Sequence, residues 1–145
     1  MLRISRLTDY ATVVMTCLAE TPHDVLSTVQ IAECTQLELP TVSKLLKQLS
    51  HAQLVESFRG VNGGYRLARA AKDITLAQII EAMEGPLGMT ECAVAAGQCA
   101  REAHCSVRGN WRRINQAVGM ALRAVSLADM LQPVDEPAPR PLMHG

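Results

Sequence analysis

A segment with three cysteines divides this chain in two. Residues 91–111 read ECAVAAGQCAREAHCSVRGNW and place Cys92, Cys99 and Cys105 in the pattern C-x6-C-x5-C. The segment is rich in Ala and Gly and poor in large apolar side chains, so it cannot build a core of its own. We therefore expect folded elements before and after it, and a further interaction that orders it. Three thiolates are suited to holding a metal or an iron–sulfur cluster.

The cysteine spacing alone leaves two interpretations open. It matches neither the paired C-x2-C of a zinc ribbon nor the C-x2-C-x2-C run of a ferredoxin. Three unrelated free cysteines in a loop would have the same spacing. The other two cysteines, Cys17 and Cys34, fall on apolar faces of expected helices, so we predict that they are core thiols rather than ligands.

The composition indicates a helical protein. Among 145 residues there are only one Trp, one Phe and two Tyr, so the core must consist of Leu, Ile, Val, Met and Ala, which favours helices. No apolar run approaches the roughly 18 residues that span a membrane, and no signal-peptide pattern is present. We therefore expect a cytoplasmic protein with no membrane partner, in which an odd number of cysteines, five, stays reduced.

The first part of the chain has the pattern of a helix-turn-helix. Residues 7–18 carry apolar side chains at helical spacing, with Thr8 as the expected N-cap. Ser27 is expected to cap a second helix, and Gln30 completes a capping box. Pro40 opens a third helix that runs to about residue 52. The residues expected to point inward are Val29, Ile31, Ala32 and Cys34 in the second helix, and Val42, Leu45, Leu46 and Leu49 in the third.

A β-hairpin is predicted directly after these helices. Residues 54–58 and 65–67 read as two strands, and the Gly- and Asn-rich residues 59–64 between them favour a turn with positive φ. A hairpin after a helix-turn-helix is typical of a winged helix. Arg59 at its tip is suited to a narrow minor groove. The residues expected to contact DNA are Ser27, Thr28, Pro40, Thr41, Ser43, Lys44, Lys47, Arg59, Gly60, Asn62 and Gly63.

The charge gives weaker support for DNA binding. The formal net charge is zero, whereas a basic balance is usual for nucleic-acid binders. Residues 1–72 hold eight Lys and Arg residues against six Asp and Glu, a small excess. In the third helix, we expect Thr41, Ser43 and Lys44 to lie near base edges and Lys47 to contact a phosphate. An ordinary helical hairpin with a solvated polar face remains the alternative for the two helices taken alone.

The remaining elements suggest dimerisation. Thr75 is expected to cap a helix that stops at Gly85 and Pro86, and Ser126 a last short helix. Between them, residues 110–125 form a long helix with an apolar stripe that exceeds the needs of so small a core, so we expect it to join two copies of the chain on a palindromic site. The expected fold is mainly α with a small β-hairpin wing, divided into residues 1–84 (DNA-binding), 85–109 (cysteine loop), 110–131 (dimerisation and terminal helices) and 132–145 (a disordered tail).

At this point the chain resembles a known family, the IscR/NsrR type of winged-helix regulators that bind an iron–sulfur cluster. The matching pieces are LTDYA at residues 7–11, Leu54-Val55, the wing sequence RG-x-x-GGY at residues 59–65, the three cysteines and Trp111. The resemblance extends from residue 1 to about residue 131 and is closest to the branch that controls the SUF cluster-assembly operon. It implies a homodimeric repressor with one cluster per subunit, 4Fe–4S or 2Fe–2S, whose occupancy alters promoter affinity.

The resemblance also implies a ligand set. Cys92, Cys99 and Cys105 match the family's cysteines. The IscR branch has a histidine three residues after the last cysteine, where this chain has Arg108, whereas the NsrR branch uses an aspartate of the partner subunit that Asp9 matches. We therefore expect Asp9 of the partner subunit to be the fourth ligand. The alternative is that Asp9 caps the first helix of its own chain, at a position that the helix dipole favours. The recognition helix has Ser43 where IscR carries a glutamate, so IscR-like sites are not assumed.

Three functions of different classes therefore remain in view. The first is a cluster-sensing repressor, with nitric oxide or redox state as a further candidate signal. The second is a regulator in which the same thiolates hold zinc in a closed tetrahedral site. The third is a small electron-transfer or cluster-carrier protein, against which the winged helix argues. An enzyme with a small-molecule substrate is not expected, because no Ser/His/Asp arrangement, phosphate loop or paired carboxylates stand out.

Overall fold

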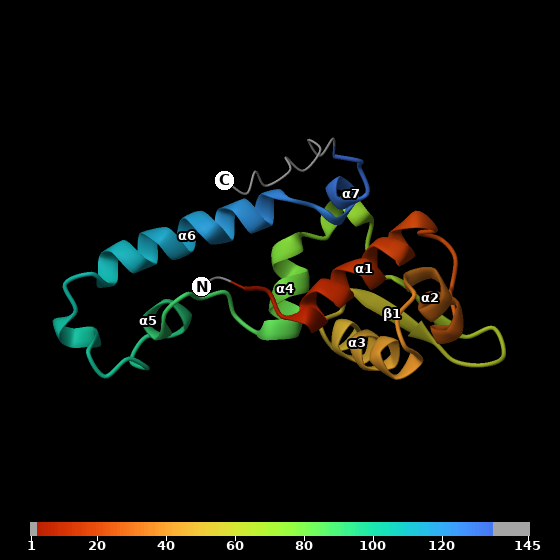
Figure 1. The fold of residues 1–145 in the computed structure, drawn as a ribbon, viewed down its shortest axis with the longest axis horizontal. Helices are drawn as coiled ribbons and strands as arrows, with labels where there is room; N and C mark the ends of the chain where they lie inside the picture. The colour runs from red at the N-terminus through yellow and green to blue at the C-terminus, as the bar shows by residue number, and fades with distance from the viewer. Residues whose placement is uncertain (1–2, 135–145) are drawn as a thin grey trace, which may run out of the picture.

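The computed structural model describes residues 3–134 and confirms a mainly helical fold with one two-stranded antiparallel hairpin. In chain order the elements are α1 (Arg6–Glu20), α2 (Thr28–Thr35), α3 (Leu39–His51), β1 (Val55–Phe58), β2 (Gly64–Leu67), η1 (Ala71–Asp73), α4 (Leu76–Glu84), α5 (Glu91–Val94), η2 (Glu102–His104), α6 (Arg108–Ala124) and α7 (Leu127–Met130). Elements α1–α4, β1, β2, η1 and α7 form the body, and α5, η2 and α6 form an arm that extends from it (Figure 1).

The body has an aliphatic core, as the composition predicts. The core residues with no exposed surface are Ala11, Val14, Met15, Ile31, Val42, Leu45, Leu46, Leu49, Ile74, Ile79 and Leu127. They come from five helices and the segment before α4, so α1–α4 close around one centre. Leu127 reaches this core because the chain returns to the body after α6: its N–H donates to the Ile74 carbonyl at 2.7 Å, and the Leu76 N–H donates to the Val125 carbonyl at 2.9 Å.

Local capping signals place three helix starts correctly. Ser27, Thr75 and Ser126 each accept a hydrogen bond from a backbone N–H three residues on, and each belongs to a complete capping box. The expected cap of the first helix is wrong. Helix α1 begins at Arg6 because Ser5 caps it, accepting the Thr8 N–H at 3.2 Å, while Thr8 lies buried inside the first turn. Helix α3 likewise begins at Leu39, one residue before Pro40.

Helix α2 buries less than its apolar pattern predicts. Cys17 of α1 is 4% exposed and is a core thiol, but Cys34 of α2 is exposed, so its expected place in the core is wrong. Val29 is 52% exposed, and Ile31 is the one buried residue of α2. The reason is geometric: an eight-residue helix at the edge of the body presents barely two turns to the core, and only a narrow strip can face inward.

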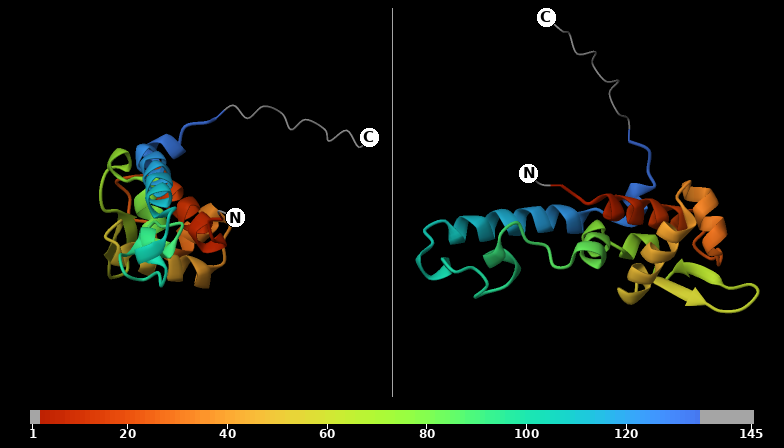
Figure 2. Two further views of the ribbon diagram at one scale, coloured as in Figure 1. Left: turned by 90° about the vertical axis from the view of Figure 1, so that its left-hand side faces the viewer. Right: turned by 60° about the horizontal axis from the view of Figure 1, so that its bottom comes forward.

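The arm holds the cysteine loop away from the body. The cysteine loop and the tip of the hairpin lie at opposite ends of the molecule, which two directions of view agree on (Figures 1 and 2). Arg123 near the end of α6 pairs with Glu81 of α4 at 4.0 Å, and this contact joins the arm to the body. Among residues 3–134, every helix is too short or too polar to cross a membrane. Most of the expected tail, residues 135–145, lies outside the described residues.

Candidate DNA-binding surface and cysteine loop

Helices α2 and α3 form the predicted helix-turn-helix. Gln36 adopts a left-handed conformation with φ of 58° directly after α2, which turns the chain toward α3. The four apolar residues predicted to face inward from α3 are completely buried, at 0% exposure each. On the opposite side Lys44 and Lys47 are exposed, while Thr41 and Ser43 are half-buried. The second helix therefore presents polar and basic side chains outward from a fixed apolar base.

The hairpin forms the predicted wing. Val55 pairs with Leu67 and Phe58 with Gly64, and the two chain ends of the hairpin lie on the body. Gly60 has a φ of +108°, as the Gly-rich turn predicts, and Arg59, Gly60 and Asn62 are all exposed. Arg66 is engaged within the wing, 3.3 Å from Glu56 and over the Phe58 ring at 4.8 Å. Within residues 3–134 no ion pair involves Arg59, so its charge is available to a ligand.

A contact that sequence reasoning missed fixes the wing against α2. Tyr65 of β2 and Leu26 exchange both backbone hydrogen bonds, at 2.8 and 2.9 Å. Gly64 makes this approach feasible, because a Cβ atom there would lie 2.1 Å from the Leu26 carbonyl oxygen. From the sequence alone, Gly64 can be recognised only as a turn former, because Leu26, which it approaches, lies far away along the chain.

The wing and the start of α2 enclose a common hollow. Five of the residues predicted to contact DNA line it, namely Ser27, Thr28, Arg59, Gly60 and Gly63. Lys47 of α3 lines a second hollow beside the wing, with Ser57 and Tyr65. Pro40, Thr41, Ser43, Lys44 and Asn62 line neither hollow. Backbone N–H groups at a helix start, a guanidinium and an ammonium group together form a surface suited to phosphates.

The three cysteines of the loop are free and half-buried. Cys92 lies in α5, and its sulfur is 3.2 Å from the Thr90 hydroxyl oxygen. Cys99 and Cys105 lie on either side of η2. Their donor chemistry fits an iron–sulfur cluster or zinc, since cysteine sulfur is the usual ligand of both. Within residues 3–134, however, no group of three or more His, Cys, Asp or Glu side chains is gathered for a metal ion, so binding requires the loop to rearrange.

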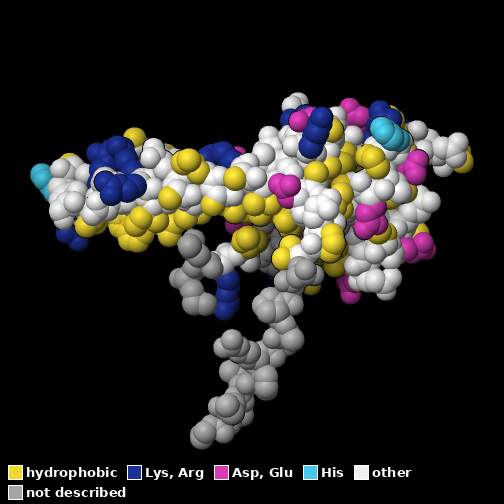
Figure 3. Space-filling view, turned by 90° about the horizontal axis from the view of Figure 1, so that it is seen from above, with side chains coloured by type: hydrophobic (Ala, Val, Ile, Leu, Met, Phe, Trp, Pro, Cys, Tyr) yellow, Lys and Arg dark blue, Asp and Glu magenta, His cyan; other side chains and the backbone are white. Residues whose placement is uncertain are grey.

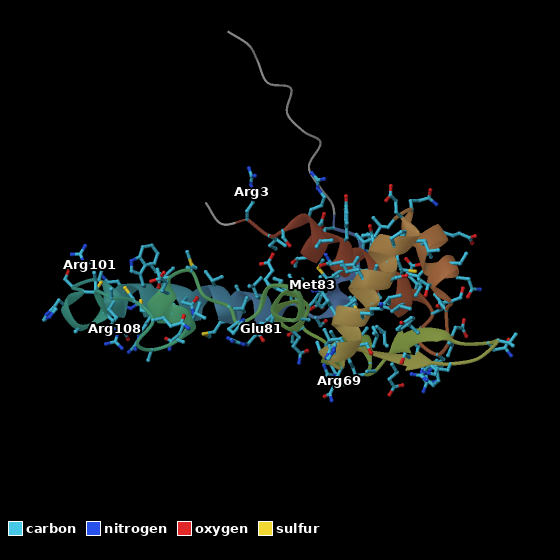
Figure 4. The ribbon with its side chains drawn as sticks, turned by 90° about the horizontal axis from the view of Figure 1, so that it is seen from below. Arg3, Arg69, Glu81, Met83, Arg101 and Arg108 are labelled. Atoms are coloured by element: carbon cyan, nitrogen blue, oxygen red, sulfur yellow. The ribbon has the colours of Figure 1, made fainter. Side chains whose placement is uncertain are left out.

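Glu102 orders the loop in its present form. Its carboxylate accepts the N–H of Gly97 and pairs with Arg108 at the start of α6, and Arg112 lies 3.9 Å away. The Glu102 side chain is only 10% exposed. Arg108, which stands where the IscR branch has a histidine, thus holds the loop to α6; Figure 4 shows it on the arm. Sequence reasoning missed this contact, because a spacing of six residues follows no helical periodicity.

Asp9 lies on the exposed side of the first turn of α1. It lines a hollow with Arg3, Arg6 and Thr12 on the body, whereas the cysteines lie on the arm. The structure of one chain therefore does not bring Asp9 to the loop cysteines.

Comparison with known proteins identifies the fold's family. The family model of Rrf2, described as an iron-dependent transcriptional regulator, matches residues 4–133. The chain belongs to the Rrf2 family. It is similar to IscR of Cereibacter sphaeroides, with 27% identity covering 95% of this chain and 92% of that protein, and to NsrR of Halalkalibacterium halodurans, with 28% identity covering 93% and 94%. Both are named HTH-type transcriptional regulators.

Solved structures agree with this assignment. CymR of B. subtilis, described as the global cysteine regulator, superimposes with a TM-score of 0.71 at 31% identity, covering 90% of this chain and 97% of CymR. This Rrf2 protein is therefore a DNA-binding transcriptional regulator with a winged-helix fold, and not an enzyme. The resemblance to IscR/NsrR-type regulators is confirmed, and the electron-transfer alternative is set aside.

Proposed function

We propose that this Rrf2 protein is a homodimeric repressor whose affinity for a palindromic promoter site is set by an iron–sulfur cluster in its cysteine loop. The observation that carries the proposal is the set of three free, half-buried thiols in one loop that has no apolar core. Such a loop gains order from a ligand, and the thiolates supply soft donors that suit iron–sulfur clusters. By the resemblance to IscR-type regulators, its targets include the SUF cluster-assembly genes.

The arm supports the dimer in this proposal. Trp111 and Ile114 of α6 are 36% and 41% exposed in the single chain, although they are large apolar side chains, and their spacing of three residues places them on one side of the helix. Apolar side chains gather along one edge of the arm and continue onto the body (Figure 3). A contiguous exposed apolar surface of this kind is typical of a protein interface. A symmetric pairing of two such helices also suits a two-fold operator.

A second subunit would bring a fourth ligand within reach. We propose Asp9 of the partner subunit for this role, with Cys92, Cys99 and Cys105 as the other three ligands. Asp9 is exposed, lines a hollow with Arg3 and Met130 of α7, and makes no ion pair within residues 3–134, so its carboxylate is available to a ligand. One oxygen ligand among thiolates binds iron weakly, and a cluster held in this way suits a sensor.

The contacts of this chain indicate how occupancy of the loop could alter DNA binding. Gathering the three thiols requires the segment from Cys92 to Cys105 to move, and that movement strains the Glu102–Arg108 ion pair that holds it to α6. At the other end of the loop, α4 ends at Glu84, which is hydrogen-bonded to the first turn of α1. We propose that these two connections carry the change from the loop to the body. A bound cluster would add a group that nitric oxide, oxygen or peroxide can modify.

The experiment that tests the proposal uses anaerobically purified protein. We expect a brown protein with visible absorption, bound iron and bound sulfide. Cys99→Ala should lose all three, whereas Cys34→Ser, the matched cysteine outside the loop, should keep them. A colourless wild-type protein that fails to take up iron and sulfide would contradict the proposal. If that protein instead contains stoichiometric zinc, the three thiolates form a structural zinc site.

A further inference from the structure

The tip of the wing carries a fully exposed apolar side chain. Val61 is 104% exposed, the highest value among the large apolar side chains of residues 3–134. Phe58, the other large apolar residue near the tip, lies against the Arg66 guanidinium instead. The loop of the hairpin extends beyond the other elements of the body in two directions of view (Figures 1 and 2). Val61 therefore contributes no apolar burial to the stability of its own fold.

The turn holds Val61 in this outward position. The Gly63 N–H donates to the Gly60 carbonyl at 3.0 Å and closes a turn that contains Val61. Gly60 has a φ of +108°, which favours glycine. A Cβ atom on Gly63 would lie 2.4 Å from the Phe58 carbonyl oxygen, so the backbone is closely packed under the tip. The turn therefore leaves the Val61 side chain directed at solvent, where a ligand can contact it.

The surface between α3 and the wing fits a phosphate backbone. The second hollow contains side chains from both elements, and each of them can donate a hydrogen bond. Its lining residues are Lys47, Ser50, His51, Gln53, Ser57 and Tyr65. No carboxylate is among them, and Glu56 of β1 is paired with Arg66. In a DNA duplex a phosphate backbone separates the major groove from the minor groove. With α3 in the major groove and a phosphate backbone in this hollow, the wing tip lies at the adjacent minor groove.

The minor groove offers different chemistry to Arg59 and to Val61. A·T and T·A pairs present only the acceptors adenine N3 and thymine O2, to which an arginine can donate. A G·C pair adds the N2 amino group of guanine, a donor that projects into the groove. The Val61 side chain has no acceptor, so its contact with this amino group excludes water and leaves the donor unsatisfied. An unsatisfied donor of this kind lowers the affinity by roughly tenfold.

We propose that Val61 is a specificity-determining residue, which selects A·T over G·C pairs in the minor groove under each wing of the DNA-bound protein. Arg59 supplies the attraction to the groove, and Val61 disfavours the guanine amino group. The proposal rests on contact of the wing with DNA and involves neither the cysteine loop nor a metal. It therefore concerns which base pairs are preferred, whereas the cluster proposal concerns how tightly the preferred site is bound.

Base analogues isolate the effect of the guanine amino group. In a duplex that the full-length protein selects from a random-sequence pool, each A·T pair is replaced in turn by G·C and by inosine·C. Inosine lacks the N2 amino group but keeps the major-groove edge of guanine. At about one or two pairs of each half-site, we expect G·C to weaken binding about tenfold and inosine·C to restore it to within about twofold. The proposal is overturned if inosine·C binds as weakly as G·C at every pair, since the major groove is then read, or if G·C is tolerated throughout.

A variant of nearly the same shape assigns the preference to Val61. Val61→Thr adds a hydroxyl that can accept a hydrogen bond from the guanine amino group, and the fully exposed position leaves the fold intact. We expect the ratio of affinities for the A·T and G·C duplexes to fall from about tenfold to less than about threefold.

The control is Val13→Thr, the same change at an exposed valine of α1, which should keep the wild-type ratio. Because each ratio is measured within one preparation, it does not depend on how the cysteine loop sets the overall affinity. A Val61→Thr protein that keeps the full ratio, whether it binds both duplexes tightly or both weakly, would assign the preference to Arg59 or to the groove width and overturn the proposal.

Discussion

Glu84, the last residue of α4, accepts a hydrogen bond of 2.9 Å from the hydroxyl of Thr8 in the first turn of α1. The same carboxylate oxygen accepts the Ser5 N–H at 2.7 Å. Glu84 is also the last residue before Gly85, where the chain leaves the body for the cysteine loop. The Glu84 side chain therefore connects the start of the cysteine loop to α1, the helix that carries Asp9.

This relationship predicts a pH-dependent contribution to stability. The Ser5 N–H, and to a lesser degree the Thr8 hydroxyl, hold the pKa of the Glu84 carboxyl below its ordinary value of 4.5, against an opposing effect of burial. Because the folded-state pKa is lowered, the stabilisation is complete above 4.5 and is lost as the pH falls through the lower folded-state value. Glu84→Gln should therefore reduce the free energy of unfolding by about 0.5–1 kcal/mol at neutral pH, because water screens this exposed group.

Chemical denaturation of both proteins across pH measures this difference. The gap between wild type and Glu84→Gln should narrow as the pH falls below 4.5. The control is Glu91→Gln, at an exposed residue whose side chain makes no hydrogen bond or ion pair within residues 3–134. The free energy of unfolding of this variant should equal that of the wild type at every pH. A gap that is constant with pH would show that the Glu84 charge does not stabilise the fold.

The wing predicts a sequence-independent contribution to DNA affinity. Arg59 is exposed at the mouth of the hollow beside Ser27 and Thr28, and Arg59→Ala should weaken binding to all duplexes. The slope of log affinity against log salt should fall by about one, as expected for one lost phosphate contact. Arg69→Ala is the matched control, because Arg69 is equally a surface arginine but bonds Gln78 in the body at 3.4 Å. Arg59→Ala protein that binds as tightly as wild type would count against the wing assignment.

The apolar edge of α6 predicts the oligomeric state. Ile114 is 41% exposed in one chain, and Ile114→Lys would place a charge in the proposed dimer interface. We expect this change to weaken the dimer by about two orders of magnitude, as for a central interface residue. Gln116→Lys, at an exposed position on another side of the same helix, should leave the dimer intact. Sedimentation velocity distinguishes these outcomes, and a monomeric wild-type protein would refute the dimer.

Much of this fold could be predicted because its signals are local. Ser27 and Gln30 lie within one turn and define a helix start without any tertiary contact. The wing glycines likewise indicate a turn by themselves. Signals that depend on distant partners were missed or misread. Thr8 was predicted to be the N-cap, but Ser5 has that role. Thr8 is instead buried, and its hydroxyl donates to Glu84, which lies 76 residues away.

For the candidate sites too, local features could be predicted from the sequence, whereas features that depend on tertiary packing could not. Residue type and spacing indicate that Cys92, Cys99 and Cys105 belong to one loop, and the structure keeps them in one loop. The exposure of Cys34 could not be read from the apolar pattern of α2, because that depends on how little of a short helix faces the core.

Mixed dimers test whether Asp9 acts across the subunit interface. Asp9→Ala dimers should hold a labile cluster and Cys99→Ala dimers none. A heterodimer of the two chains contains one site with all its ligands, formed by the cysteines of the first chain and Asp9 of the second. We therefore expect the tagged and purified heterodimer to bind a stable cluster at half the wild-type iron content. If Asp9 acted within its own chain, the heterodimer would contain no site with all four ligands, and it would bind no stable cluster.

The central claim is that the state of the cysteine loop controls DNA affinity. The direct measurement is the dissociation constant for a duplex selected by the protein from a random-sequence pool, determined on one preparation before and after removal of its cluster. Cys99→Ala, treated identically, controls for the chemical treatment. We predict that cluster removal changes the wild-type affinity by at least tenfold, equivalent to about 1.4 kcal/mol, and leaves Cys99→Ala unchanged. Equal wild-type affinities with and without the cluster would contradict the account.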